Sequence, residues 1–130
     1  MAAVGIKDLR TALESILATV CGNTSSTTAV DISFKKARDP STTVYLVYDL
    51  DDTASEWTQQ VMLEIRLITH GDDTTALETL GDKLWCDLDH FYHLDSNLEF
   101  AIYRNVRNSL DADDKTLNVR RLLFELRLHV

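Results

Sequence analysis

The chain has few of the residues that mark specialised protein classes: its 130 residues include one proline, four glycines and two cysteines. Two cysteines are too few for a small secreted scaffold held by several disulfides. The sequence also lacks a basic start followed by a sustained apolar run, and it has no apolar stretch long enough to span a bilayer. We therefore expect a soluble, intracellular protein with no membrane partner.

What the chain does contain is ordinary globular composition, with 45% hydrophobic and 26% charged residues. A chain of this length can bury one hydrophobic core without disulfide support, so residues 1–130 are expected to form a single domain. Thirteen Lys and Arg against twenty-one Asp and Glu leave a net charge of -8. A surface of that sign repels phosphate backbones, so tight non-specific DNA binding is not expected.

Hydrophobic periodicity predicts the elements of the first half. Apolar residues at three- and four-residue steps predict an amphipathic helix that ends at Gly22, where a left-handed C-cap fits. Alternation predicts a strand over residues 30–34, and β-branched and aromatic residues predict a second strand over 43–50. A third strand over 57–67 follows a short polar turn, which favours an antiparallel hairpin. The helical stripe consists of Ile6, Leu9, Leu13, Ile16, Leu17 and Val20.

The residue pattern of the second half of the chain predicts one helix and two strands. Thr75 and Glu78 form a capping-box pattern before an apolar stripe. Within the predicted helix, Gly81 costs about 1 kcal/mol relative to alanine, which suggests that another element approaches the helix backbone closely. Alternating residues predict strands over 98–102 and 122–128. The stripe consists of Leu77, Leu80, Leu84, Leu88 and Phe91.

The predicted fold is therefore α+β, with the order αβββαββ and a mostly antiparallel five-stranded sheet that has two helices packed on one face. Two helices cannot cover both faces of such a sheet. Apolar residues nevertheless fall on the other face, which indicates that this face is partly dry in an assembly. They are Tyr45, Val47, Met62, Ile68 and Tyr103.

One motif suggests catalysis. Asp49-Leu-Asp51-Asp52-Thr53 follows an apolar strand and resembles motif one of haloacid-dehalogenase-type phosphatases. The resemblance implies that Asp49 attacks phosphorus, that Asp51 is the general acid and base, and that both hold Mg²⁺. That family carries the motif on a parallel strand that leads into a helix, whereas an alternating strand follows here. An Asp-rich hairpin turn is the alternative interpretation.

A second candidate is a metal site. Cys86, His90 and His93 have four- and three-residue spacing on the predicted second helix, with Asp87 and Asp89 as further ligands, which suggests zinc. The alternative is a polar helix end with buried thiols at Cys21 and Cys86. The acidic residues of His70-Gly-Asp72-Asp73 are explained by the positive end of the helix dipole. We therefore expect no catalytic residue, cofactor or metal, and no enzyme activity.

Charged residues are unevenly distributed. Arginines gather on the last two strands and acidic residues in the loops, so the arginines either form ordinary cross-strand ion pairs or meet a neighbouring subunit's acidic loop. We select eleven residues as an oligomer or lumen interface on this basis. They are Asp49, Asp51, Asp52, Glu56, Arg104, Arg107, Asp111, Asp113, Asp114, Arg120 and Arg121.

The pattern of the whole chain is similar to the tail terminator family of long-tailed phages, typified by minor tail protein U of lambdoid phages. The resemblance rests on element order, length, acidity and the Trp57-initiated strand, with the last strand running to the end of the chain. It implies a structural virion protein that forms a ring of six on the tail tube, stops tube polymerisation and provides the surface to which the head docks.

The implied partners are further copies of the chain, the tail tube protein and a head-completion or connector protein. The implied location is the tail–neck junction of the virion, after assembly in the host cytoplasm. The resemblance further implies that genome DNA passes through the ring without specific binding, which an acidic lumen would favour. A head–tail joining or tail-completion neck protein, an adaptor that binds a peptide along a sheet edge, and the phosphatase are the alternatives.

Overall fold

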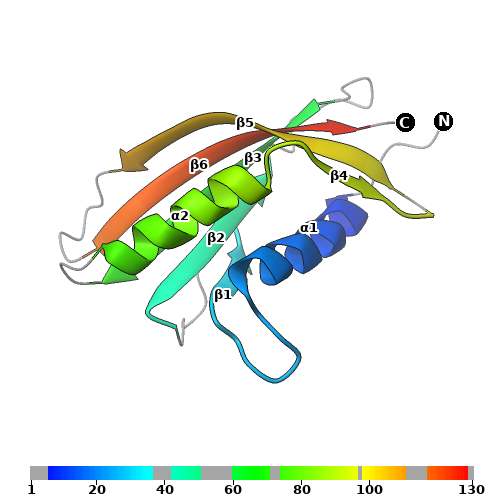
Figure 1. Cartoon of the computed structure of the whole chain (residues 1–130). Coiled ribbons are helices and arrows are strands. Elements are labelled where there is room, and N and C mark those ends of the chain that lie inside the picture. The colour runs from blue at the N-terminus through cyan, green and yellow to red at the C-terminus, as the bar shows by residue number, and fades with distance from the viewer. Residues whose placement is uncertain are drawn as a thin grey trace.

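The computed structural model describes residues 6–36, 42–50, 60–70, 74–96, 98–110 and 117–128. These ranges contain two helices and six strands (Figure 1). In chain order the elements are α1 (Ile6–Cys21), β1 (Asp31–Phe34), β2 (Val44–Leu50), β3 (Gln60–His70), α2 (Thr75–Asp87), β4 (Phe91–Leu94), β5 (Glu99–Leu110) and β6 (Leu117–Leu128).

The strands form one mixed sheet in the order β1-β2-β3-β6-β5-β4, curved into a half-barrel. Both helices lie on the same side of this sheet (Figure 1). β2 and β3 form the expected antiparallel hairpin, with Leu46 opposite Leu67. β6, the last strand in sequence, inserts between β3 and β5 and pairs antiparallel with both. The long strands β3, β5 and β6 thus form the centre of the half-barrel.

The predicted five-stranded, mostly antiparallel sheet is wrong in two respects, although the chain is broadly α+β. First, α2 ends at Asp87, and the chain reverses through His90, whose φ is 63°. Residues 91–94 then pair antiparallel with β5 as β4. Phe91 continues the three- and four-residue spacing of the helical stripe, so periodicity alone assigned it to the helix.

Second, β1 pairs parallel with β2, so the sheet is mixed. Asp31 lies opposite Tyr45 and Phe34 opposite Tyr48. Alternating apolar and polar residues look the same in a parallel and an antiparallel edge strand, because the side-chain period is two in both. The direction of β1 could therefore not be obtained from its four residues.

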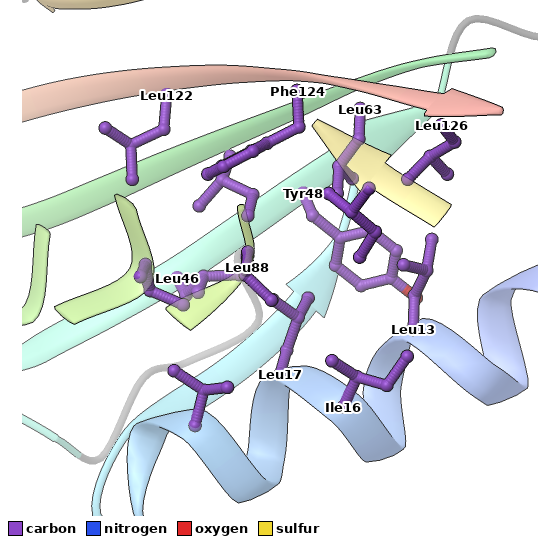
Figure 2. Close-up of a cluster of buried hydrophobic side chains, with 14 of the residues drawn as sticks. Leu13, Ile16, Leu17, Leu46, Tyr48, Leu63, Leu88, Leu122, Phe124 and Leu126 are labelled. Atoms are coloured by element: carbon purple, nitrogen blue, oxygen red, sulfur yellow. The ribbon is translucent and has the colours of Figure 1, made fainter. Parts of the chain in front are cut away.

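The core is an apolar layer between the sheet and the helices. Leu13 and Leu17 of α1 have no exposed surface and point toward Tyr48 of β2 and Leu88 (Figure 2). The Tyr48 hydroxyl donates a 2.6 Å hydrogen bond to a carboxylate oxygen of Glu14 on α1, which satisfies the one polar atom of this ring. On α2 the buried residues are Leu77, Gly81 and Leu84.

The end of α1 is fixed as the sequence predicts. Gly22 has φ 83°, its N–H donates to the carbonyl of Thr19, and the N–H of Asn23 donates to the carbonyl of Ala18. This pair of hydrogen bonds is a Schellman motif, and it satisfies carbonyls that the helix leaves without a partner. Glycine is favoured here because the left-handed conformation is costly for a residue with a Cβ.

The start of α2 differs from the prediction. Its N-cap is Thr74 rather than Thr75, and no side chain caps the helix. The Glu78 carboxylate lies 3.5 Å from the Thr74 hydroxyl. Glu78 therefore interacts with an N-cap residue four positions before it, not three as in a capping box. The expected close approach at Gly81 is also ordinary contact, since an added Cβ would lie 3.5 Å from Nη2 of Arg107 and 3.6 Å from Cδ1 of Leu67.

The two cysteines have different surroundings. Cys21 is buried as predicted, and burial raises the pKa of its thiol to about 11, an effect that the positive charge of Lys83 partly offsets. Cys86 was expected to be buried but is exposed, because it lies on the side of α2 away from the sheet-facing Leu77 and Leu84. Cys21 is therefore a structural thiol, and Cys86 is accessible to reagents.

We expect Gly81→Ala to stabilise the protein by about 1 kcal/mol, because alanine has the higher helix propensity and its Cβ fits without displacement. Gly22→Ala should destabilise it by about 1 kcal/mol, since the left-handed C-cap disfavours a Cβ. Urea denaturation of the two variants and the wild type measures both effects. Equal shifts in the same direction would contradict the assignment of these two glycines.

The Cys21 thiol should make stability fall at alkaline pH. Its pKa in the folded protein lies above its value in the unfolded chain, so its contribution is complete below pH 9.0 and is lost as the pH rises toward about 11. The expected loss is about 2 kcal/mol. Urea denaturation from pH 8 to pH 11 should give a weaker decline for Cys21→Ala than for the wild type. Cys86→Ala is the control, and it should keep the wild-type decline.

Candidate functional site

Three of the four described arginines selected from the sequence face α2 and form ion pairs within the molecule. Each reaches from β5 or β6 to a carboxylate on α2 or in the turn that follows it. The Arg104–Asp89 and Arg120–Glu78 pairs have N–O distances of 3.2 and 3.3 Å. The three pairs are Arg104 with Asp89, Arg107 with Asp82 and Arg120 with Glu78. These ion pairs connect the helix and its following turn to the sheet. The charges of the three arginines are therefore already compensated within the molecule.

Asp89 is the most firmly held of these carboxylates. The backbone N–H of Arg104 donates to it at 3.1 Å, and this hydrogen bond is the main reason that the pKa of Asp89 lies below its usual value. His90 lies 3.1 Å away and also favours the ionised form. The Arg104 guanidinium lies 5.6 Å from the centre of the Trp85 ring. This cluster connects the end of α2 to β5 just before β4 begins.

The fourth arginine, Arg121, lies on the other side of the sheet. It is opposite Arg66 in the β3–β6 register and donates to the side-chain oxygen of Asn108 at 3.1 Å. Arg66 lies 3.3 Å from the Glu64 carboxylate. Like charges directly opposite each other weaken a sheet unless anions compensate them. Only one carboxylate among the described residues is ion-paired with this arginine pair.

Asp49 lies on the same outer side, at the end of β2 and opposite Glu64. The two line a hollow of about 250 Å³ together with apolar side chains, and Oδ1 of Asp49 is buried without a hydrogen-bond partner among the described residues. The strand that follows, β3, is antiparallel to β2. The phosphatase resemblance requires a different context, with the motif on a parallel strand. The apolar lining consists of Leu50, Met62 and Leu123.

The remaining predicted interface and motif residues lie outside the described residues. They are Asp51, Asp52, Glu56, Asp72, Asp73, Asp111, Asp113 and Asp114.

The proposed metal ligands do not share a helix face. Cys86 is on α2, His90 is in the turn after it, and His93 is on β4, because the helix ends at Asp87. His93 stacks on the Phe100 ring at 5.0 Å and lies 2.7 Å from a carboxylate oxygen of Asp95. Within the described ranges, no three His, Cys, Asp or Glu side chains are grouped closely enough to hold a metal ion. The helical spacing that suggested zinc therefore does not apply.

The structure reveals an exposed apolar edge that periodicity missed. β4 forms one border of the half-barrel, and its inward edge is hydrogen-bonded to β5. Two of its four residues point outward with much of their surface exposed, Tyr92 at 53% and Leu94 at 64%. Glu99 lies opposite Leu94 and accepts a hydrogen bond from the Tyr92 hydroxyl, which raises the pKa of that hydroxyl. The alternating segment Phe-Tyr-His-Leu at residues 91–94 is a sequence signal for this strand. Periodicity instead placed Phe91 on the helical stripe.

The opposite border, β1, begins with Asp31 and has several cations near its end at Phe34. The Arg10 guanidinium lies 4.0 Å from the centre of the Phe34 ring, and Nζ of Lys35 lies 5.5 Å from it. Lys36 is exposed next to Lys35, and Nη2 of Arg66 reaches the Lys35 carbonyl at 3.5 Å. The end of β1 is therefore basic, although the chain has a net charge of -8.

The outer face of the sheet also buries apolar side chains. Tyr45 and Val47 of β2 are 7% and 3% exposed, although they do not belong to the core between sheet and helices. Met62, Ile68 and Tyr103 are half-buried on the same face. The Arg127 guanidinium covers Tyr103 at 4.4 Å from the ring centre. The sequence correctly identified this face as apolar.

Neither helix in the described part of the chain has the length and hydropathy needed to cross a membrane.

Comparison with known proteins identifies the fold. No family model and no curated protein matches the chain. A solved structure superposes on it with a TM-score of 0.68 over 97% of this chain and 98% of the other, at 14% sequence identity. The half-barrel with two helices is thus a fold that a distant sequence also adopts.

If the three arginines only fasten α2, their removal should affect stability and leave association unchanged. We expect Arg107→Gln and Arg120→Gln each to lower the free energy of unfolding by about 0.5 kcal/mol, the usual size for partly exposed ion pairs. A double-mutant cycle with Asp82→Asn isolates the first pair. Native mass spectrometry should find the wild-type association state, and its loss in either arginine variant would assign that arginine to an interface instead.

Proposed function

We propose that the chain is a structural virion protein of a long-tailed phage, a tail terminator. Copies of it form a ring of six on the end of the tail tube, stop further tube polymerisation and offer the surface to which the head docks. Its partners are then other copies, the tail tube protein and a head-completion or connector protein. It is assembled in the host cytoplasm and resides at the tail–neck junction of the virion.

The observation that carries this proposal is the pair of open sheet borders. Within the part of the chain that the structure describes, β1 and β4 each pair with one strand only, and β4 exposes Tyr92 and Leu94. A half-barrel with two unlike borders is suited to head-to-tail contact between identical copies, and such contact closes into a ring when the rotation permits.

The charge of the chain suits passage of DNA through such a ring. A net charge of -8 gives a surface that repels the polyanion and keeps it from adhering. The terminator is preferred to the neck proteins because the whole-chain pattern resembles that family. A head–tail joining or tail-completion protein would share the ring and differ in its partner.

The oligomeric state is the first test of this proposal. Native mass spectrometry of the purified chain should detect six copies of the 14.7 kDa polypeptide. A chain that stays monomeric at high concentration, both alone and with tail tube protein from the same genome, would contradict the proposal.

The capping activity is the second test. Tail tube protein encoded in the same genome should polymerise to indefinite length alone and to shorter, capped tubes when the chain is added, as measured by negative-stain electron microscopy. Binding to heads with no effect on tube length would favour the neck-protein alternative.

A further inference from the structure

The two open borders of the sheet point in the same direction. β1 is parallel to β2, and four successive antiparallel pairings lead from β2 through β3, β6 and β5 to β4. An even number of reversals returns the chain to its starting direction, so β1 and β4 run parallel on opposite borders. In a ring generated by rotation, β4 of one copy would therefore meet β1 of the next as a parallel pair.

We propose that neighbouring copies join through these borders, with β4 of one copy adding to β1 of the next and extending the sheet. This inference rests on the proposed ring and specifies its interface. Both strands have four residues, so their lengths match. Exposed backbone groups at a sheet edge readily accept another strand.

Parallel pairing also matches the charges. It aligns the carboxyl ends of the two strands, so Lys35 and Lys36, which follow β1, come beside Asp95, which follows β4 and also contacts His93. Glu99 opposite Leu94 adds a second carboxylate to the same end. A symmetric, antiparallel β4–β4 contact would instead place Asp95 beside the start of the partner's β4 and leave the lysines outside the interface. Charge complementarity thus selects a head-to-tail neighbour over a two-fold dimer.

The exposed side chains provide the apolar part of the contact. Tyr92 and Leu94 lie on the outer side of β4, next to the buried Ala101 of β5. An added strand would cover part of their surface, which the single copy leaves in water. Val106 is also exposed, at 43%, but it lies beyond the part of β5 that pairs with β4. It is therefore a matched control for substitutions at the border.

Charge reversal tests the interface at two exposed side chains. Lys36→Glu and Asp95→Lys should each raise the concentration for half-assembly roughly tenfold, which corresponds to about 1.4 kcal/mol, and the double variant should restore assembly. Leu94→Glu should weaken assembly at least as much, whereas Val106→Glu should leave it unchanged. Mass photometry over a concentration series, with circular dichroism to verify folding, gives these values.

Cross-linking distinguishes the modes of contact. In a Cys86→Ser background, Leu94→Cys and Lys36→Cys are combined and treated with a short flexible bismaleimide. The double variant should give a ladder of covalent oligomers that ends at the ring, and each single variant should give none. Dimers from Leu94→Cys alone would establish a symmetric β4 contact and overturn the proposal.

The outcomes separate this inference from the proposed function. A wild-type ring that persists in Leu94→Glu, with no cross-linked ladder in the double cysteine variant, would refute the border contact and leave the terminator proposal intact. A wild-type chain that never assembles, alone or with the tube protein, would refute both.

Discussion

The structure depends on the burial of one apolar layer between the inner face of the sheet and two helices. Leu13, Leu63 and Phe124 come from α1, β3 and β6, and none retains exposed surface. Burial of such side chains is the dominant favourable contribution to folding. It fixes which face of each strand points inward, because a shift of one residue would turn every apolar side chain toward water.

This arrangement of helices and sheet determines which partners the arginines contact. α2 packs against β3 and β6, so arginines on the inner face of β5 and β6 reach carboxylates on this helix or in the turn after it. Arg121, on the outer face, has no such helix beside it and meets Arg66 instead. The same residue type thus fastens a helix on one face and makes contacts within the sheet on the other.

Curvature of the sheet has the consequence that matters most for function. A half-barrel does not close on itself, so among the described strands β1 and β4 form two borders that each pair with one neighbour, unlike the strands of a complete barrel. One border is basic around Phe34, and the other exposes Tyr92 and Leu94 near Asp95 and Glu99. An open sheet with unlike borders has the features of one part of a larger, repeated assembly.

The sequence by itself determined what local periodicity and backbone chemistry encode: α1 with its glycine cap, the β2–β3 hairpin, the buried Cys21 and the apolar outer face. It failed where local signals are degenerate, since Phe91 fits a helix stripe as well as a strand. It also could not give the direction of β1 or the partners of Arg104, Arg107 and Arg120. Those features depend on which distant segments pair, and only the tertiary structure, which inserts β6 between β3 and β5, decided them.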